Sequence, residues 1–281
     1  MRISVLPDLH MEMLTKQAAQ KAAKLVAKDL PDVLILAGDV GCPLKNFCTA
    51  LDVFSESAKT VAVLAGNHDL WHTIFSAIGS EELWSLRLPE ETRKRKMAWL
   101  EDGFVSDGET AVVGSVAWYD YSARDTAFSS MSDEYFAETK GEYNNDGNYI
   151  DWQRSDVQFS EHVRNALCGR IAKLNDDASI KSIFVATHVP VFPEQRGFPQ
   201  SFGARGSEYF GNWTLGRELE KFDKIAAIAS GHTHIGKKSE HLCRDGRVVP
   251  CSVIGSDYGK PKHETFEIGG RGGKIRIVED E

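Results

Sequence analysis

The feature that most constrains this chain is an apolar run that ends at a glycine and a carboxylate. Val33–Ala37 contains five consecutive apolar residues, preceded by Asp32 and followed by Gly38 and Asp39. Such a run is typical of a strand buried on both faces, as in a parallel sheet. Ligands of open α/β sheets bind beyond the carboxyl ends of the strands, so Asp39 is expected to project into a binding site.

The rest of the chain alternates between apolar runs and helical patterns. Further strands that end in polar residues are expected at 3–6, 61–65, 183–186 and 225–229. Three helices are expected. Apolar residues at every fourth position indicate one at 15–30, an early proline indicates one at 43–58, and a capping-box pattern indicates one at about 155–174. Closing strands without polar ends are expected at 248–249, 252–254, 266–268 and 275–278. This alternation of strand, helix and strand predicts an α/β fold.

The residues that follow the five polar-ended strands are of metal-binding types. They are Asp8, His10, Asp39, Asn67, His68, His188, His232 and His234. We expect them to meet at one edge of a sheet, where there are enough ligands for two metal ions. Carboxylate and imidazole ligands without a thiolate favour Mn, Fe or Zn. Two neighbouring cations need a bridging anion, and Asp39 on the central strand is the candidate.

The composition argues against several classes of partner. The formal net charge of −8 does not suit a surface that neutralises nucleic-acid phosphates or anionic lipids. No apolar run approaches the length of a membrane span, and the opening residues are too short for a signal peptide, so the expected location is the cytoplasm. The five cysteines are odd in number and scattered, which indicates reduced packing residues.

The polar strand ends form an ordered set of motifs. In chain order they are D-x-H from Asp8, G-D at Asp39, G-N-H-D around Asn67, the isolated His188, and G-H-T-H ending at His234. This set resembles the calcineurin-like metallophosphoesterase superfamily, and within it bacterial metal-dependent phosphohydrolases. The resemblance implies a four-layer α/β/β/α sandwich of two mixed sheets flanked by helices, with a dinuclear metal site at the carboxyl ends of the strands.

The same resemblance assigns roles to the residues of the motifs. It implies that one metal is held by Asp8, His10, Asp39 and His234, and the other by Asp39, Asn67, His188 and His232. His68 would be the proton donor. The implied activity is hydrolysis of phosphomonoesters or phosphodiesters by metal-activated water, with two divalent ions, Mn or Fe first and Zn as a further candidate.

Two other functions stay open at this point. A non-catalytic scaffold that uses the fold to bind proteins would be expected to have lost metal ligands, and none is missing. A metal-dependent nuclease would be expected to have a basic groove, which the acidic composition disfavours. The motifs act on the phosphate, so they specify neither the substrate nor the oligomeric state.

Two segments without strand or helix patterns follow strands that carry ligands. We expect a single domain over residues 1–281 with an insertion at about 119–154, the cap segment, which is polar and aromatic and shows no sustained helical period. With the long loop at 192–212 it is expected to cover the metals and select the substrate. Arg196 and Arg205 are expected to engage a second phosphate or a carboxylate of that substrate. The alternative is a solvated, partly disordered insertion.

Asp69 is expected either to orient His68 or to cap the following turn.

Overall fold

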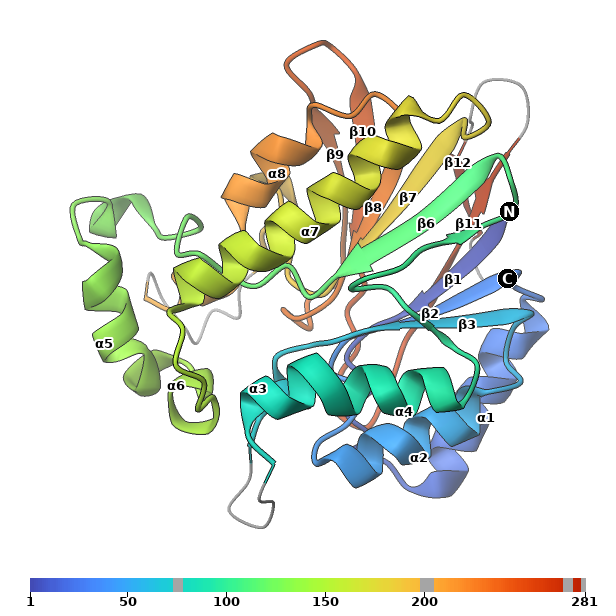
Figure 1. Cartoon of the computed structure of the whole chain (residues 1–281), viewed down its shortest axis with the longest axis horizontal. Helices are drawn as coiled ribbons and strands as arrows, with labels where there is room; N and C mark the ends of the chain where they lie inside the picture. Colours follow the sequence, from blue (N-terminus) through green and yellow to red (C-terminus); the bar gives the residue numbers. More distant parts are fainter. Residues whose placement is uncertain (73–77, 198–204, 270–274, 279–281) are drawn as a thin grey trace.

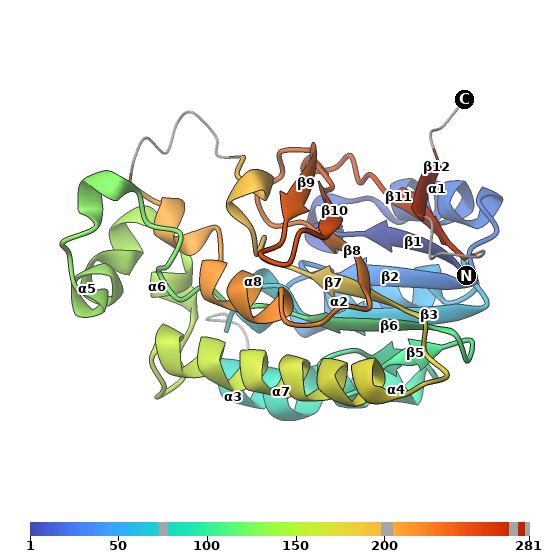
Figure 2. The ribbon, with the colours of Figure 1, turned by 90° about the horizontal axis from the view of Figure 1, so that it is seen from above.

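The computed structural model contains two mixed β-sheets that face each other (Figures 1 and 2). It describes residues 1–72, 78–197, 205–269 and 275–278. The first sheet consists of β1 (Arg2–Leu6), β2 (Val33–Ala37), β3 (Thr60–Leu64), β4 (Ala98–Trp99), β11 (Glu264–Ile268) and β12 (Ile275–Val278). The second consists of β5 (Val105–Ser106), β6 (Thr110–Ser115), β7 (Ser182–Thr187), β8 (Ile225–Ser230), β9 (Lys237–Leu242) and β10 (Val248–Val253).

Both sheets have a parallel centre, with antiparallel strands at one edge of the first sheet and at both edges of the second. The first has the order β12-β11-β1-β2-β3-β4, and its strands β1 to β4 are parallel. The second has the order β5-β6-β7-β8-β10-β9, with β6, β7, β8 and β10 parallel. The carboxyl ends of neighbouring parallel strands lie at the same edge of each sheet, which is where polar ligands can gather.

Helices cover the outer face of each sheet (Figures 1 and 2). The first sheet is covered by α1 (Lys16–Lys28), α2 (Leu44–Phe54), α3 (Ser80–Glu82) and α4 (Leu88–Lys94), with a π-helical turn η3 (Leu83–Arg87) between the last two. The second is covered by α7 (Asp156–Asp176) and α8 (Trp213–Leu219). Short 3-10 turns are η1 (Met11–Met13), η2 (His68–Leu70), η4 (Thr126–Phe128), η5 (Pro193–Gln195) and η7 (Ser207–Tyr209). The predicted four-layer α/β/β/α sandwich is therefore confirmed.

Strand β2 shows why the sandwich holds together. Its inward-facing Val33 and Ile35 belong to the apolar cluster between the sheets, which also contains Phe184 of the opposite sheet. The alternate residue Leu34 belongs to the outer cluster, where it shares a core with Phe47 of α2. All five residues of the strand are buried. Burial on both faces explains the unbroken apolar run in the sequence.

Two parts of the fold differ from the expectation. The cap segment contains two helices, α5 (Asp133–Tyr143) and α6 (Asp146–Tyr149), which extend beyond the sandwich (Figure 1). The prediction of no helix there was wrong, because α5 buries only Phe136 and so shows no apolar stripe in the sequence. Strand β9 was not predicted either. It is an edge strand in which only His241 is buried, so it lacks the apolar alternation that marks a half-buried strand.

The helix predicted from the capping box is confirmed. The Ser155 hydroxyl accepts a hydrogen bond from the Gln158 backbone N–H at 3.1 Å, and the Gln158 side chain accepts one from the Ser155 backbone N–H at 3.0 Å. These two bonds satisfy N–H groups that a helix start leaves unpaired. No helix in the described part of the chain is both long and apolar enough to cross a lipid bilayer.

Candidate metal centre

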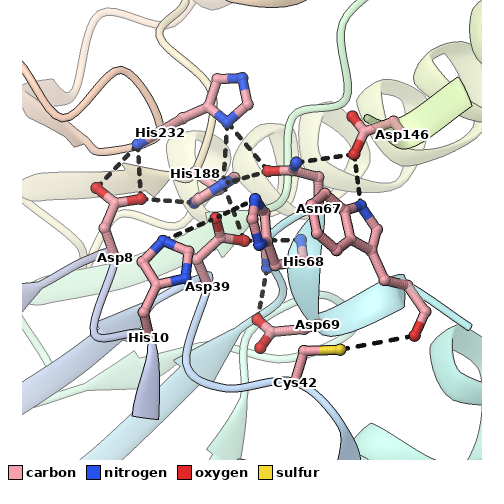
Figure 3. A network of polar contacts seen from close by, with 12 residues as sticks. Asp8, His10, Asp39, Cys42, Asn67, His68, Asp69, Asp146, His188 and His232 are labelled. Carbon is pink, nitrogen blue, oxygen red and sulfur yellow. Dashed lines mark hydrogen bonds and ion pairs between the residues drawn. The ribbon is translucent and has the colours of Figure 1, made fainter. Parts of the chain in front are cut away.

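The predicted ligand residues lie together between the carboxyl ends of strands from both sheets (Figure 3). The loops after β1, β2 and β3 come from the first sheet, and the loops after β7 and β8 come from the second. The expectation that all of them meet at the edge of one sheet was wrong, because the chain changes sheets after β4. The two sheets face each other, so the cluster joins them.

Several of these residues have an unusual backbone conformation. A positive φ angle occurs at Asp8 (51°), His10 (43°), Asp39 (49°), His232 (68°) and His234 (58°). Residues other than glycine rarely adopt this left-handed conformation, and each instance costs on the order of 1–3 kcal/mol. Such strain persists only where the surrounding structure stabilises it, and it is concentrated at functional sites.

Two glycines of the motifs allow the chain to approach this cluster closely. A Cβ atom on Gly66 would lie 2.1 Å from both the backbone nitrogen and the Oδ1 atom of Asp39. A Cβ atom on Gly38, whose φ is 84°, would lie 2.5 Å from Nδ1 of His188. Both distances are far below van der Waals contact. The glycines that precede Asp39 and Asn67 are therefore required by the geometry of the cluster.

The ligand atoms form two groups. In the first, potential ligand atoms of Asp8, His10 and His234 lie within 4.8 Å of one another, and the Nε2 atoms of the two histidines are 3.4 Å apart. In the second, the Asn67 Oδ1 atom lies 3.0 Å from His188 Nε2 and 3.0 Å from His232 Nδ1. Separations of about 3 Å are those of ligands that share one ion with bonds near 2.1 Å.

Asp39 lies between the two groups. Its Oδ2 atom is 3.5 Å from His10 Nε2, and its Oδ1 atom is 3.4 Å from His188 Nε2. The Oδ1 atom also accepts a hydrogen bond from the backbone N–H of His68 at 2.9 Å, which fixes the orientation of the carboxylate. The two oxygens of one side chain thus face different groups, as a bridging ligand requires.

The four histidines of these two groups are each oriented by an oxygen on the far side of the ring. These contacts are His10 Nδ1 to Glu12 Oε1 at 3.0 Å, His188 Nδ1 to the Ala37 carbonyl at 3.1 Å, His232 Nε2 to the Tyr209 carbonyl at 3.0 Å, and His234 Nδ1 to the Ser256 carbonyl at 2.7 Å. A ring nitrogen that donates to such an oxygen leaves the lone pair of the other nitrogen directed at the cluster. This arrangement fits metal ligation.

The electrostatics of the cluster also fit a cation. Burial raises the pKa of Asp8, and burial together with the nearby Asp69 and Asp8 carboxylates raises the pKa of Asp39 well above its usual value. Burial lowers the pKa of His188 well below its usual value and that of His232 to about 4, so both rings are neutral at pH 7. Crowded carboxylates and neutral imidazoles form a donor set that divalent ions such as Mn, Fe or Zn stabilise.

His68 lies beside the cluster and faces a cavity. Its ring stacks on Trp71, with 3.6 Å between centroids, and its Nε2 atom is 3.9 Å from Asp39 Oδ2. Burial, reinforced by His10 and the other histidines, lowers its pKa well below the usual value. His68 and Asp39 both line the cavity, whose volume is about 370 Å³. The ring is therefore placed to contact a molecule bound at the cluster.

Asp146 of α6 contacts the cluster although the sequence did not indicate it. Its buried carboxylate accepts a hydrogen bond from Asn67 Nδ2 at 2.9 Å (Figure 3). It also accepts hydrogen bonds from Trp71 Nε1 at 2.6 Å and from the Tyr119 hydroxyl at 2.9 Å. Because the Asn67 nitrogen faces Asp146, its Oδ1 oxygen faces His188 and the other histidine of that group. In the sequence, Asp146 belongs to an Asn- and Gly-rich stretch that is typical of an ordinary turn.

Asp69 has a role different from both predicted ones. Its carboxylate accepts hydrogen bonds from the backbone N–H groups of Val40 at 3.2 Å, Gly41 at 2.9 Å and Gly66 at 2.8 Å. Burial raises its pKa to about 6, although the three N–H donors favour the ionised form. Asp69 therefore holds the loops after β2 and β3 together and does not contact the ring of His68 through any of these bonds.

Tyr258 is a second residue that the sequence did not reveal. Its ring stacks on His234, with 4.7 Å between centroids, and it lines the same cavity. It follows β10, which pairs in parallel with β8. Recognition of that parallel pairing would have placed the residues after β10 at the ligand edge of the sheet.

The two arginines do not line the cavity, although Arg205 lies directly behind its wall. The Arg205 guanidinium lies 4.0 Å from the ring centroid of Tyr143 and pairs with Glu208 at 3.2 Å. Arg196 lies 3.4 Å from Asp125. Neither arginine is among the described residues that line the cavity. Both arginines belong to the 192–212 loop and contact residues of the cap segment. Their expected contact with the substrate therefore gains no support from this geometry.

Comparison with known proteins identifies the family of this chain. The family model of calcineurin-like phosphoesterases matches residues 1–236, which include every predicted ligand. The chain belongs to this family. Calcineurin-like phosphoesterases are typically dinuclear, with divalent metal ions, and this chain is accordingly a metal-dependent phosphoester hydrolase. The alternative of a non-catalytic protein-binding scaffold is therefore not supported.

Solved structures of phosphoesterases have the same fold. The phosphopantetheinyl hydrolase of Mycobacterium tuberculosis is 18% identical, with a TM-score of 0.70 over 93% of this chain and 94% of that protein. A dimetal phosphatase of Danio rerio is 13% identical, with a TM-score of 0.53 over 94% of this chain and 91% of that protein. At these identities the similarity shows the fold. No curated protein matches the chain in sequence.

Proposed function

We propose that this phosphoesterase hydrolyses phosphomonoesters or phosphodiesters of small molecules with two divalent metal ions. One ion would be held by Asp8, His10, Asp39 and His234, and the other by Asp39, Asn67, His188 and His232. The observation that supports this best is the position of Asp39, whose two oxygens lie 3.5 Å and 3.4 Å from His10 and His188. Bound in this way, the ions would supply a nucleophilic water and offset the charge of the phosphate. Mn or Fe is the first candidate and Zn the next.

His68 is the proposed proton donor to the leaving oxygen, a role for which the negative charge of a bound phosphate would have to offset the burial and the histidines that lower its pKa. Its ring is held by stacking on Trp71 and faces the cavity beside Asp39. A donor placed in this way typically contributes about 10²–10⁴-fold to the rate. The backbone N–H of His68 donates to Asp39, so the position of the ring is linked to that of the bridging carboxylate.

The cap segment and the 192–212 loop are proposed to select the substrate as parts of a single domain. Tyr143 and Asn144 of the cap segment line the cavity, as does Phe210 of the loop. Tyr209 of the same loop donates its hydroxyl hydrogen to the Phe136 carbonyl of α5 at 2.8 Å and lies behind His232. The two segments are thus in contact with each other and with the cluster.

Two further proposals concern partners and location. A nuclease function is disfavoured by the net charge of −8, because binding to nucleic acid depends largely on neutralising phosphates. The proposed compartment is the cytoplasm, which suits a chain whose five cysteines are free thiols.

The experiment that tests the proposed function measures metal content and activity together. The purified protein is expected to contain two divalent ions per chain and to hydrolyse members of a panel of nucleotides, cyclic nucleotides, sugar phosphates, 4′-phosphopantetheine and nitrophenyl esters. Removal of the metal with a chelator should abolish turnover, and Mn should restore it. A protein that remains active without metal, or that hydrolyses no member of the panel when loaded, would contradict the proposal.

A further inference from the structure

Apart from residues of the metal cluster, the described walls of the cavity beside it are formed mainly by aromatic and uncharged polar residues, with one acidic residue, Glu142. Its aromatic lining residues are Trp71, Tyr143, Phe210 and Tyr258. The residues Gly141, Glu142, Asn144 and Asn145 complete the wall that the cap segment contributes. Among the described lining residues there is no lysine or arginine. Apart from histidines of the cluster, the part of the cavity wall that the structure describes therefore offers no cationic group to a substrate.

Two cationic side chains of the segments that form the cap side of the cavity are held in other contacts, and Lys260 and Lys262, which follow Tyr258, are exposed and do not line the cavity. Lys140 of α5 forms an ion pair with Asp156 at 2.8 Å, and Arg205 pairs with Glu208. Residues 73–77 and 198–204, which the structure does not describe, contain no lysine or arginine in the sequence. A second anionic group on a substrate would therefore find no lysine or arginine among the described lining residues, and Lys140 and Arg205 are engaged elsewhere.

Building on the proposed function, we infer that this enzyme selects phosphoesters whose leaving group has no negative charge. Among the described lining residues, positive charge would be confined to the end with the proposed metal ions, where the reacting phosphate would bind. A second phosphate or a carboxylate on the leaving group would lie against aromatic faces and near the carboxylate of Glu142, which repels it. Uncharged groups that are flat or contain amides can instead stack on Tyr143 and Tyr258 and form hydrogen bonds with Asn144.

A pair of nearly isosteric substrates tests this inference. Glycerol 3-phosphate and 3-phosphoglycerate share a three-carbon chain and a primary leaving oxygen, and they differ by a hydroxymethyl group against a carboxylate. With the Mn-loaded enzyme, kcat/KM for glycerol 3-phosphate is expected to be about tenfold higher or more. The methyl diesters of both compounds are assayed in parallel, in case the enzyme prefers diesters. If turnover of the pair is slow, their inhibition constants against 4-nitrophenyl phosphate give the same comparison.

Variants of Glu142 connect the preference to the cavity wall. Glu142→Gln is expected to reduce the ratio of kcat/KM for glycerol 3-phosphate to kcat/KM for 3-phosphoglycerate by about threefold. Glu142→Lys is expected to reduce the same ratio by about tenfold. The matched control is Glu134, an exposed carboxylate of the same helix that does not line the cavity. Glu134→Gln and Glu134→Lys should leave the ratio unchanged. The effect of Glu142 should weaken as the salt concentration rises.

The outcomes separate this inference from the proposed function. If both substrates react with equal kcat/KM, or if the Glu142 variants leave the ratio as it is, selection by leaving-group charge is wrong while the proposed hydrolysis stands. If the Mn-loaded protein hydrolyses no phosphoester at all, including the activated nitrophenyl esters, the proposed function fails and the inference fails with it.

Discussion

The carboxylate of Asp146 holds the side-chain amide of Asn67 at 2.9 Å and so connects the cap segment to the metal cluster (Figure 3). The same carboxylate accepts hydrogen bonds from Trp71 and Tyr119. Trp71 in turn stacks on His68, which is the proposed proton donor. One residue of a short helix outside the sandwich therefore positions both Asn67, a proposed metal ligand, and Trp71, a neighbour of the proposed proton donor.

Asp146→Asn is expected to weaken metal binding at the group that contains Asn67. In the new amide an NH2 group replaces either Oδ1, which accepts from Asn67 and Trp71, or Oδ2, which accepts from Tyr119. The negative charge that attracts the Asn67 NH2 group is also lost, so the contact that orients Asn67 is weakened. Loss of such a supporting contact typically lowers metal affinity about 10–100-fold. Titration calorimetry with Mn measures the effect, and Glu134→Gln on α5 is the control for loss of a carboxylate from the cap segment. Unchanged affinity at both sites of Asp146→Asn would contradict this role.

His68→Ala is expected to slow the reaction according to the leaving group. Turnover of an alkyl phosphodiester, whose leaving oxygen is a strong base, should fall about 10²-fold or more, whereas an activated nitrophenyl ester should be much less affected. Metal content should stay close to that of the wild type, because His68 is not a proposed ligand. An equal loss of rate on both substrates would indicate that His68 binds the phosphate and does not donate a proton.

Gly66→Ala is expected to damage both stability and metal binding. The added methyl group would lie 2.1 Å from the Asp39 backbone nitrogen and Oδ1, so either the strand end or the carboxylate must move. A cost of about 3 kcal/mol in the free energy of unfolding is expected. The control is Gly169→Ala in α7, where nothing lies within 4 Å of the added methyl group, and which should stabilise by about 0.5–1 kcal/mol. Chemical denaturation measures the free energy of unfolding of both variants. Similar free energies for Gly66→Ala and Gly169→Ala would rule out the steric argument.

The strands and motifs of this chain could be predicted because each is a local pattern. A doubly buried strand such as β2 requires an apolar run, and the glycine and carboxylate after Ala37 mark its end. The ordered motifs then identify the ligands regardless of how the sheets are arranged. What could not be predicted is the assignment of strands to two sheets, because β3 and β7 show the same pattern although they lie in different layers.

Contacts made by the cap segment could not be predicted for a different reason. Asp146 and Asn144 lie in a stretch whose composition suits any exposed turn, and only the folded chain shows that Asp146 is fully buried against Asn67. The guanidinium of Arg205 looked available for an anionic substrate, but it lies against Tyr143 and pairs with Glu208. A sequence shows which groups are charged, while their partners depend on tertiary structure.

A buried glutamate links the two sheets and should make stability depend on pH. The Oε1 atom of Glu101 accepts hydrogen bonds from the backbone N–H groups of Ala65 at 3.2 Å and Val116 at 2.7 Å, just beyond β3 and β6. Burial raises the pKa of Glu101 from 4.5 to about 7, despite the opposing effect of Arg170. Between about pH 4.5 and pH 7, Glu101 keeps its proton in the folded state but has lost it in the unfolded state. Its contribution therefore lowers the free energy of unfolding as the pH rises through this range.

The variant Glu101→Gln isolates that contribution. The difference in free energy of unfolding between the variant and the wild type should change by about 3 kcal/mol across this pH range, in favour of the variant at the higher pH. Urea unfolding of both proteins in the presence of a chelator, at several pH values, measures it. A difference that is independent of pH would show that the pKa of Glu101 is not raised in the folded state.

The central claim is that Asp39 bridges two metal ions, and metal stoichiometry tests it most directly. Elemental analysis after dialysis is expected to give two ions per chain for the wild type and about one for His10→Ala, which removes a ligand from a single group. Asp39→Asn is expected to lose both ions together, because an amide has only one oxygen for two sites. Two tightly bound ions per chain in Asp39→Asn would contradict the bridging role.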